Sequence, residues 1–258
     1  MRILYWDVFA GISGDMALGS LLALGADREN IVGQLRSMGL TEFELEVRTR
    51  LVQGIQATDI EVIIKEDTLE QRRIQEQRET DIKEDLHIHR SLQDIRRMIL
   101  SGSLSAKAQN MALEVFSVLA EAEAQIHGTT AEQVHFHEVG AVDSLVDIVG
   151  TCIALDQLNV EKIMVSKLPW SRGFVRCSHG LLPLPAPATL LLLRGFTFYD
   201  SDITGELITP TGAALIRALG SQTPLPEMTL LQTGYGSGKN HYGVPELLRG
   251  VLGETELA

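Results

Sequence analysis

The sequence predicts a mixed α/β fold, in which helices cover layers of sheet and one buried helix lies near residues 142–158. Apolar and polar residues alternate over 43–48 and again over 60–64, which is the period of half-buried strands and indicates a hairpin pair. Apolar residues recur at three- or four-residue steps over 105–127, which predicts a long helix that Gly128 ends. Residues 142–158 are almost continuously apolar, so the helix they form must be buried.

The N-terminal region begins with an expected strand over Arg2–Phe9, followed by a glycine-rich turn over Ala10–Asp15. Helices are expected next over Met16–Leu24 and Glu29–Met38, because a glycine directly follows each stretch and acts as a stop signal. A further short helix is expected over Ser91–Leu100.

Beyond Glu161 the sequence changes to short strands separated by prolines and glycines. Every second residue over 183–187 is a proline, which favours an extended segment. Short helices are expected over 188–194 and 212–219, and a strand over 206–209.

The chain divides at a charged stretch. Of the 21 residues in 65–85, 13 are ionisable with both signs mixed, which is typical of a solvated helix or loop. We therefore expect an excursion from the core over 65–90. It separates a strand, turn, helix and hairpin region, 1–64, from the remainder of the same compact unit, 91–258.

Composition and charge exclude several classes of protein. The 258 residues carry a net charge of −12, with 26 acidic and 14 basic residues in 1–159 and eight of each in 160–258. An acidic chain repels the phosphate backbone, which disfavours nucleic-acid binding, whereas its acidic half suits a metal cation and its neutral half an anionic small molecule. We expect no membrane span and no signal peptide. The two cysteines cannot form a disulfide framework, so a cytoplasmic protein with reduced thiols is expected.

The strongest candidate for chemistry combines two histidines with two aspartates. On an expected strand over 134–139, the side chains of His135 and His137 share one face about 6.6 Å apart and can converge on one ion. Asp143 and Asp147 share a face of the apolar helix that follows, where carboxylates are costly unless something pairs with them. The alternative is a pair of surface histidines beside a helical first turn that favours acids.

A second histidine pair, His87 and His89, ends the charged excursion and is either a further metal-binding pair or simply solvated. Imidazole and carboxylate ligands suit divalent nickel, zinc, cobalt or manganese. The lack of cysteine ligands argues against a structural zinc site.

The glycine-rich turn at the N-terminus is a candidate anion site. Asp7 ends the first strand and faces Ser13, Gly14 and Asp15, which precede a helix. Backbone N–H groups at such a position can hold phosphate or carboxylate. The alternative is a strand-to-helix turn that simply needs glycine.

Two later turns have similar composition. Thr209 and Thr211 precede the helix at Gly212 and offer a second small anion site, although helix capping explains Thr211 equally well. Residues 234–240, GYGSGKN, suggest a phosphate-binding loop but lack its required first glycine, and Asn240 stands where Ser or Thr would bind magnesium. A flexible closing loop is the expected structure there.

Four segments together resemble one known family in order and spacing. They are Asp7 with GISGDM at 11–16, HFHEVGAVDS at 135–144, His179-Gly180 through PAPAT at 185–189, and TPTGAA at 209–214. The chain resembles the nickel-insertion proteins of the LarC family over nearly its whole length, and the segment beginning at His135 is highly specific.

The resemblance implies a nickel chelatase, or cyclometallase, of the lyase class. Its substrate would be pyridinium-3,5-bisthiocarboxylic acid mononucleotide, and insertion of Ni²⁺ between the two sulfurs with a bond to a ring carbon would complete the nickel-pincer nucleotide cofactor of lactate racemase. Family members need Mn²⁺ or Mg²⁺ and hydrolyse CTP, which is associated with a C-terminal domain absent after Ala258. The expected partners are therefore the substrate and a C-terminal domain or polypeptide, with a homo-oligomer also considered. The alternative function is a nickel-binding module that is inactive without that partner domain.

With the resemblance, the predicted residue roles fall into three groups. The metal-holding set is His135, His137, Asp143 and Asp147, with His87 and His89 as additional ligands. The base that removes the ring proton is Glu138 or Asp15, and Glu138 is alternatively a fifth metal ligand. The anionic groups of the substrate would meet Asp7, Ser13, Gly14 and Asp15, or Thr209 and Thr211.

Overall fold

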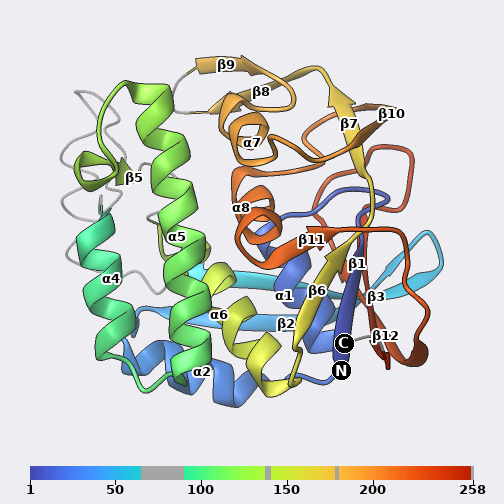
Figure 1. The fold of residues 1–258 in the computed structure, drawn as a ribbon, viewed down its shortest axis with the longest axis horizontal. Helices are drawn as coiled ribbons and strands as arrows, with labels where there is room; N and C mark the ends of the chain where they lie inside the picture. Colours follow the sequence, from blue (N-terminus) through green and yellow to red (C-terminus); the bar gives the residue numbers. More distant parts are fainter. Residues whose placement is uncertain (65–89, 137–140, 178–179, 257–258) are drawn as a thin grey trace, which may run out of the picture.

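The computed structural model describes residues 1–64, 90–136, 141–177 and 180–256. Within these residues it contains seven α-helices and a mixed sheet of seven strands (Figure 1). The predicted mixed α/β fold is therefore confirmed. No helix in these ranges is both long enough and apolar enough to cross a membrane.

The main sheet joins strands from both ends of the chain, in the order β11-β6-β1-β13-β12-β3-β2. Its strands are β1 (Arg2–Asp7), β2 (Phe43–Val52), β3 (Ile55–Ile64), β6 (Lys162–Val165), β11 (Gly220–Gln222), β12 (Thr229–Ser237) and β13 (Leu247–Glu254). Strand β1 pairs antiparallel with β13 and parallel with β6, so the first strand of the chain lies next to the last. The predicted hairpin is confirmed: β2 and β3 pair antiparallel from Phe43 opposite Ile64 to the turn at Gln53 and Gly54.

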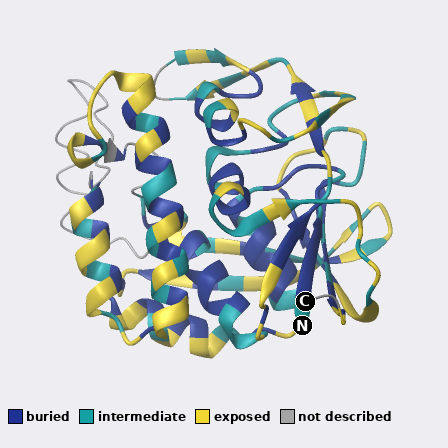
Figure 2. Cartoon of the chain, in the orientation of Figure 1, coloured by how far each residue is buried: buried dark blue, intermediate teal, exposed yellow. Residues whose placement is uncertain are grey.

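The helices pack in layers on this sheet. They are α1 (Gly14–Ala23), α2 (Arg28–Ser37), α4 (Leu92–Ser101), α5 (Ala106–His127), α6 (Val142–Gln157), α7 (Pro187–Leu192) and α8 (Pro210–Leu219). Helix α1 lies against β12 and β3, α6 packs on α1, and α5 packs on α6 and α8. The predicted burial of α6 is confirmed, because almost all of its apolar side chains are enclosed, while α4 and α5 keep exposed outer faces (Figure 2).

Local capping signals set the ends of the predicted helices. Ser91 forms a capping box with Asp94 at the start of α4, and Ser105 accepts a hydrogen bond from the Ala108 N–H at the start of α5. Gly128 ends α5 in the left-handed conformation, with φ of 63°, as the glycine signal predicts.

Three pairs of short strands complete the fold. They are β7 (Leu168–Arg172) with β10 (Phe198–Thr204), β8 (Phe174–Cys177) with β9 (Gly180–Pro183), and β4 (Arg90–Ser91) with β5 (His135–Phe136). A single 3₁₀ turn, Ala131–Gln133, precedes β5.

Three sequence-based expectations are wrong. Residues 206–209 do not form a strand, because β10 ends at Thr204 and the segment makes only one isolated bridge, between Ile12 and Ile208. Thr209 is already the N-cap of α8, which begins at Pro210 rather than at Gly212. Likewise, residues 234–237 are not part of a closing loop but belong to β12.

The glycines of β12 are explained by the helix that crosses them. A Cβ atom on Gly236 would lie 1.9 Å from the Met16 carbonyl oxygen of α1, and one on Gly234 would lie 2.6 Å from the Ser20 carbonyl oxygen. The glycine-rich motif therefore allows α1 to approach the sheet closely. It does not cradle a phosphate.

Candidate functional site

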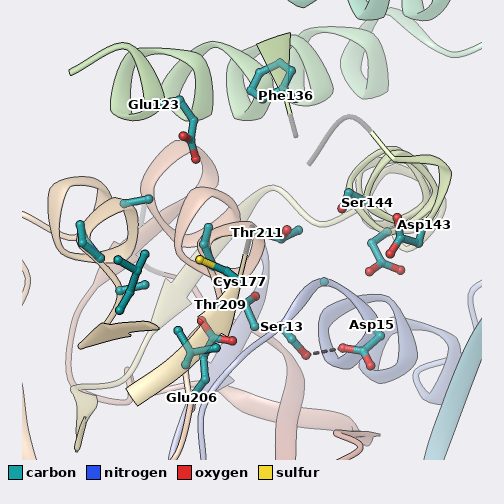
Figure 3. A pocket seen from close by; sticks show the side chains of 18 of the residues that line it. Ser13, Asp15, Glu123, Phe136, Asp143, Ser144, Cys177, Glu206, Thr209 and Thr211 are labelled. Atoms are coloured by element: carbon teal, nitrogen blue, oxygen red, sulfur yellow. Dashed lines mark hydrogen bonds between the residues drawn. The ribbon is translucent and has the colours of Figure 1, made fainter. Parts of the chain in front are cut away.

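A cavity of about 720 Å³ lies where the N-termini of α1, α6, α7 and α8 come together. Its walls also include side chains of β3, of the β8–β9 hairpin and of the C-terminal half of α5. Figure 3 shows Ser13 and Asp15 on one side of this space, Asp143 and Ser144 on a second, and Thr209 and Thr211 on a third. Three segments selected from the sequence as candidates thus meet at one cavity.

Three of these helices begin without a side-chain cap. Ser13 precedes α1, Ala141 precedes α6 and Ala186 precedes α7, and none of these side chains accepts a hydrogen bond from the first turn. By contrast, Asp27, Ser91 and Ser105 cap α2, α4 and α5 with their side chains. Uncapped first-turn N–H groups and the helix dipole favour an anionic ligand, so the starts of α1 and α6 can hold phosphate or carboxylate groups.

Gly14 is the point where three of the helices touch. A Cβ atom there would lie 2.6 Å from Asp147 Oδ2 and 2.9 Å from Thr211 Cγ2. Glycine is therefore required so that α1 can start directly against α6 and α8. This contact brings the predicted Ser13–Asp15 turn to the predicted aspartates of α6.

Three carboxylates, those of Asp15, Asp143 and Asp147, form what we call the carboxylate cluster. Asp147 is the most deeply placed: its Oδ1 atom is buried, with no hydrogen-bond partner in the described part of the chain. Burial, and then the nearby charges of Asp15 and Asp143, hold the pKa of Asp147 well above its usual range, while Lys239 acts in the opposite direction. Asp15 is better satisfied, since its Oδ1 accepts hydrogen bonds from the Ser13 hydroxyl and the Met16 N–H.

The Thr209–Thr211 turn divides its two hydroxyls between capping and the cavity. Thr209 Oγ1 accepts a hydrogen bond from Gly212 N at 3.2 Å and caps α8. The capping role considered for Thr211 thus belongs to Thr209, and Thr211 lines the cavity.

Asp7 is not brought to this cavity. It faces β13, where its Oδ2 accepts hydrogen bonds from Nε and Nη2 of Arg249, with the Nε atom at 3.1 Å. The pair links β1 to the last strand of the sheet, and Asp7 does not line the cavity wall.

The structure describes the histidines of the predicted metal set only in part. His87, His89, His137 and Glu138 lie outside the described residues, and for His135 only the backbone in β5 is described. Across the described ranges, no three or more His, Cys, Asp or Glu side chains are grouped so that they could hold a metal by themselves. The metal-holding set therefore stays a prediction.

Several cavity residues were not found from the sequence. Lys239 reaches the carboxylate cluster, with its Nζ 4.0 Å from Asp15 Oδ2, although it lies more than two hundred residues further along the chain. Glu123 and Glu206 add two more acidic side chains, and Cys177 adds a thiol (Figure 3). Lys239 follows the GYGSG segment, so the failed phosphate-loop motif was the one local signal that pointed toward it.

The two cysteines should differ sharply in reactivity. Cys152 is fully buried in α6, and burial raises the pKa of its thiol, whereas Cys177 is half-buried in the cavity wall. We expect iodoacetamide to modify Cys177 in the native protein and Cys152 only after unfolding, as measured by peptide mass spectrometry. Equal modification of both thiols in the native protein would contradict the described cavity.

Carboxylates and uncapped helix starts face the same space, so this cavity is suited to a small ligand that carries both a cation and anionic groups. A family model described as "Nickel insertion protein" matches residues 4–258. The chain belongs to this family. No solved structure matches it.

Curated relatives extend the comparison. A protein of Desulfitobacterium hafniense (strain DSM 10664 / DCB-2) is 43% identical over 98% of this chain and 59% of its own length. Proteins of Acetivibrio thermocellus and Akkermansia muciniphila are 41% and 43% identical over 99% of this chain and 61% of theirs. All three are named pyridinium-3,5-bisthiocarboxylic acid mononucleotide nickel insertion proteins. The chain thus spans about 60% of the length of these relatives.

Proposed function

We propose that this chain inserts nickel into pyridinium-3,5-bisthiocarboxylic acid mononucleotide, as the names of its relatives indicate for them. The observation that carries the proposal is the family match over residues 4–258, which includes every element that builds the cavity. A cavity of about 720 Å³ falls within the roughly 300–1,000 Å³ typical of small-molecule sites, which suits a mononucleotide.

The anionic groups of the substrate would meet the helix starts. Ser13, Gly14 and Asp15 open α1, and Thr211 lies in the first turn of α8. Backbone N–H groups at such positions bind phosphate and carboxylate well. Asp7, which pairs with Arg249, would support the first of these turns from β1 and would not contact the ligand.

Nickel would be held by the set His135, His137, Asp143 and Asp147, with His87 and His89 as additional ligands. The carboxylate cluster does not make a metal site by itself, so this proposal requires the imidazoles as well. Imidazole and carboxylate bind Ni²⁺ exchangeably, which suits a protein that must pass the ion on to the softer sulfur atoms of its substrate.

The insertion step needs a base. Nickel forms bonds to two sulfurs and one ring carbon, the C–H bond at that carbon breaks, and the proton passes to a carboxylate. Asp15 or Glu138 would accept it, and Asp15 lines the cavity.

The further properties implied by the family complete the proposal. The reaction would be that of a lyase-class chelatase acting in the cytoplasm, and its product would be the nickel-pincer nucleotide cofactor of lactate racemase. CTP, with Mn²⁺ or Mg²⁺, would act through the portion of the longer relatives that this chain does not span, as a C-terminal domain or partner polypeptide. We propose neither nucleic acid nor a membrane as a partner. A second copy of this chain is a proposed partner, in a homo-oligomer.

The direct test is nickel insertion by the purified chain. Ni²⁺, the pyridinium mononucleotide, Mg²⁺ and CTP are supplied, and formation of the nickel-pincer chromophore is followed by absorbance. We expect the chromophore to form with this chain alone, because it supplies the nickel and pyridinium sites. No chromophore even after the remaining part of a full-length relative is added would contradict the proposal.

A second candidate function is favoured by the length comparison. A chain that spans about 60% of its relatives can be a nickel-binding module whose chemistry occurs only with the other portion. The same assay decides between the two. Chromophore formation by this chain alone excludes the module, and formation only after the second portion is added supports it.

A further inference from the structure

The proposed substrate and the cavity carry charge of the same sign. A mononucleotide with two thiocarboxylates is an anion, and the carboxylate cluster faces the space where it would bind. Like charges repel strongly in a partly desolvated cavity, so a cation is needed between them. Among the described lining residues, the basic side chains are those of His127, Arg176 and Lys239.

Lys239 is the one of these three that reaches the carboxylate cluster. Its Nζ lies 4.0 Å from Asp15 Oδ2, and its charge also acts on Asp147. His127 instead pairs with Glu123 on the same helix, with Nε2 3.3 Å from Oε2. A separation of 4.0 Å and a side chain 55% exposed leave the ammonium loosely held, so it can exchange Asp15 for a ligand.

The backbone around Lys239 is fixed much more firmly than its side chain. Glu246, only 6% exposed, accepts hydrogen bonds from the backbone N–H and the side-chain amide of Asn240. Its carbonyl oxygen accepts a third from Gly238 N at 3.0 Å. A Cβ atom on Gly238 would lie 2.4 Å from Glu246 Cδ, so the turn is built closely around this carboxylate.

A buried carboxylate needs such compensation, because burial penalises its charged form. Burial raises the pKa of Glu246, while its hydrogen bonds with Asn240 lower it. What this arrangement achieves is to hold residues 238–240 in one conformation at the cavity rim. The arrangement fixes where the Lys239 side chain starts and leaves its ammonium free to move.

We propose that Lys239 binds a ring thiocarboxylate of the pyridinium mononucleotide and that Glu246 positions it to do so. This inference rests on the proposed function. When Ni²⁺ binds at Asp143 and Asp147, it would offset negative charge of the carboxylate cluster, and the ammonium would turn from Asp15 to the thiocarboxylate oxygen. The sulfur of the same group is then left to face the metal. A ring substituent, and not the phosphate, is the partner because Lys239 stands beside the carboxylates that would receive nickel.

The test uses two stable pyridinium mononucleotides as probes. Nicotinate mononucleotide carries a ring carboxylate, and nicotinamide mononucleotide carries a neutral amide in its place. With the full chain in calorimetry, Lys239→Met should weaken nicotinate mononucleotide binding by at least about 10-fold, the effect of losing a charge-assisted hydrogen bond. Binding of nicotinamide mononucleotide should change by less than about twofold. Lys239→Arg should restore most of the affinity for nicotinate mononucleotide.

Further variants separate a contact from a structural effect. Glu246→Gln should reduce the preference for nicotinate over nicotinamide mononucleotide by about threefold, since one hydrogen bond to the turn is lost. Lys167→Met, which removes an exposed lysine that does not line the cavity, should bind both probes as the wild type does. Ni²⁺ affinity should not fall in Lys239→Met, because a competing cation has been removed.

The outcomes distinguish this inference from the proposed function. A wild-type chain that binds neither mononucleotide overturns both. If the wild type binds and Lys239→Met binds nicotinate mononucleotide equally well, only the role of Lys239 is overturned. An equal loss for both probes overturns the ring assignment and indicates a phosphate contact. A loss of Ni²⁺ affinity in Lys239→Met indicates a structural role instead.

Discussion

Replacing Asp147 with asparagine should make the protein more stable and, at the same time, weaken the proposed binding of Ni²⁺. The Asp147 carboxylate has a buried Oδ1 atom without a hydrogen-bond partner in the described residues, and Asp15 and Asp143 repel its charge. Asparagine has almost the same shape but no charge, so we expect the free energy of unfolding to rise by about 1–2 kcal/mol near neutral pH. Urea denaturation monitored by circular dichroism measures it.

The stabilisation should depend on pH in a defined direction. The pKa of Asp147 in the folded state is raised above its unfolded value, so folding favours the protonated acid. The loss of stability that the buried charge causes in the wild type is therefore complete above the folded-state pKa of Asp147. It disappears as the pH falls below the ordinary pKa of an aspartate. Because asparagine does not titrate, the stability curves of the two proteins should converge in acid. If the two curves of stability against pH stayed parallel down to acid pH, the added stability of Asp147→Asn would not come from removing the charge of Asp147.

Asp147→Asn should combine weaker nickel binding with greater stability, and the gain in stability should distinguish Asp147 from Asp143 on the same helix. We expect Asp147→Asn to lower Ni²⁺ affinity by at least the roughly 10- to 100-fold that loss of a supporting group costs a metal site. Asp143→Asn is the matched control for stability, because its carboxylate is exposed and its removal should change the free energy of unfolding by less than about 0.5 kcal/mol. Greater stability together with weaker nickel binding identifies a carboxylate kept for function.

Elements whose signals are local could be predicted from the sequence. Ser91 and Asp94 lie three residues apart and form the capping box of α4, and Gly128 directly follows the apolar repeat of α5. The β2–β3 hairpin has matching alternation on either side of one short turn. In each case the partners that stabilise the element lie close together in the chain.

Pairings between distant parts of the chain could not be predicted. The partner of Asp7 is Arg249, and that of Asp15 is Lys239, because β13 and β12 return beside the first strand and helix. Nothing in a local pattern specifies that return. The sequence did indicate the Ser13–Asp15 turn and the aspartates of α6 separately, and the close contact at Gly14 brings them together.

The same contacts between distant segments explain why the GYGSGKN motif was wrongly expected to form a flexible closing loop. Three glycines in seven residues favour a loop only when the segment is considered alone. Once α1 is packed across β12, Gly234 and Gly236 become positions where a helix backbone occupies the space of a side chain. A glycine required by packing and a glycine required by a ligand look alike in a sequence.

Replacing Gly236 with alanine should therefore be strongly destabilising, although it adds a single methyl group. The new Cβ would lie 1.9 Å from the Met16 carbonyl oxygen and 2.7 Å from Ser20 N, both backbone atoms of α1 that no rotamer change can move. The helix would have to lift from the sheet, so we expect the free energy of unfolding to fall by about 3 kcal/mol or more. Urea denaturation would measure the loss as a lower midpoint, with the same dependence of the unfolding free energy on urea concentration in variant and wild type.

Gly33→Ala is the control, because it makes the same chemical change where no atom lies within 4 Å of the new Cβ. Gly33 is exposed in the interior of α2, where alanine is a better helix former than glycine, so this variant should gain about 0.5–1 kcal/mol. The two Gly→Ala substitutions change the free energy of unfolding in opposite directions only if the α1–β12 contact is as close as described. A mild effect of Gly236→Ala, similar to that of Gly33→Ala, would mean that α1 lies further from the sheet. The cavity at the start of α1 would then differ from the one described.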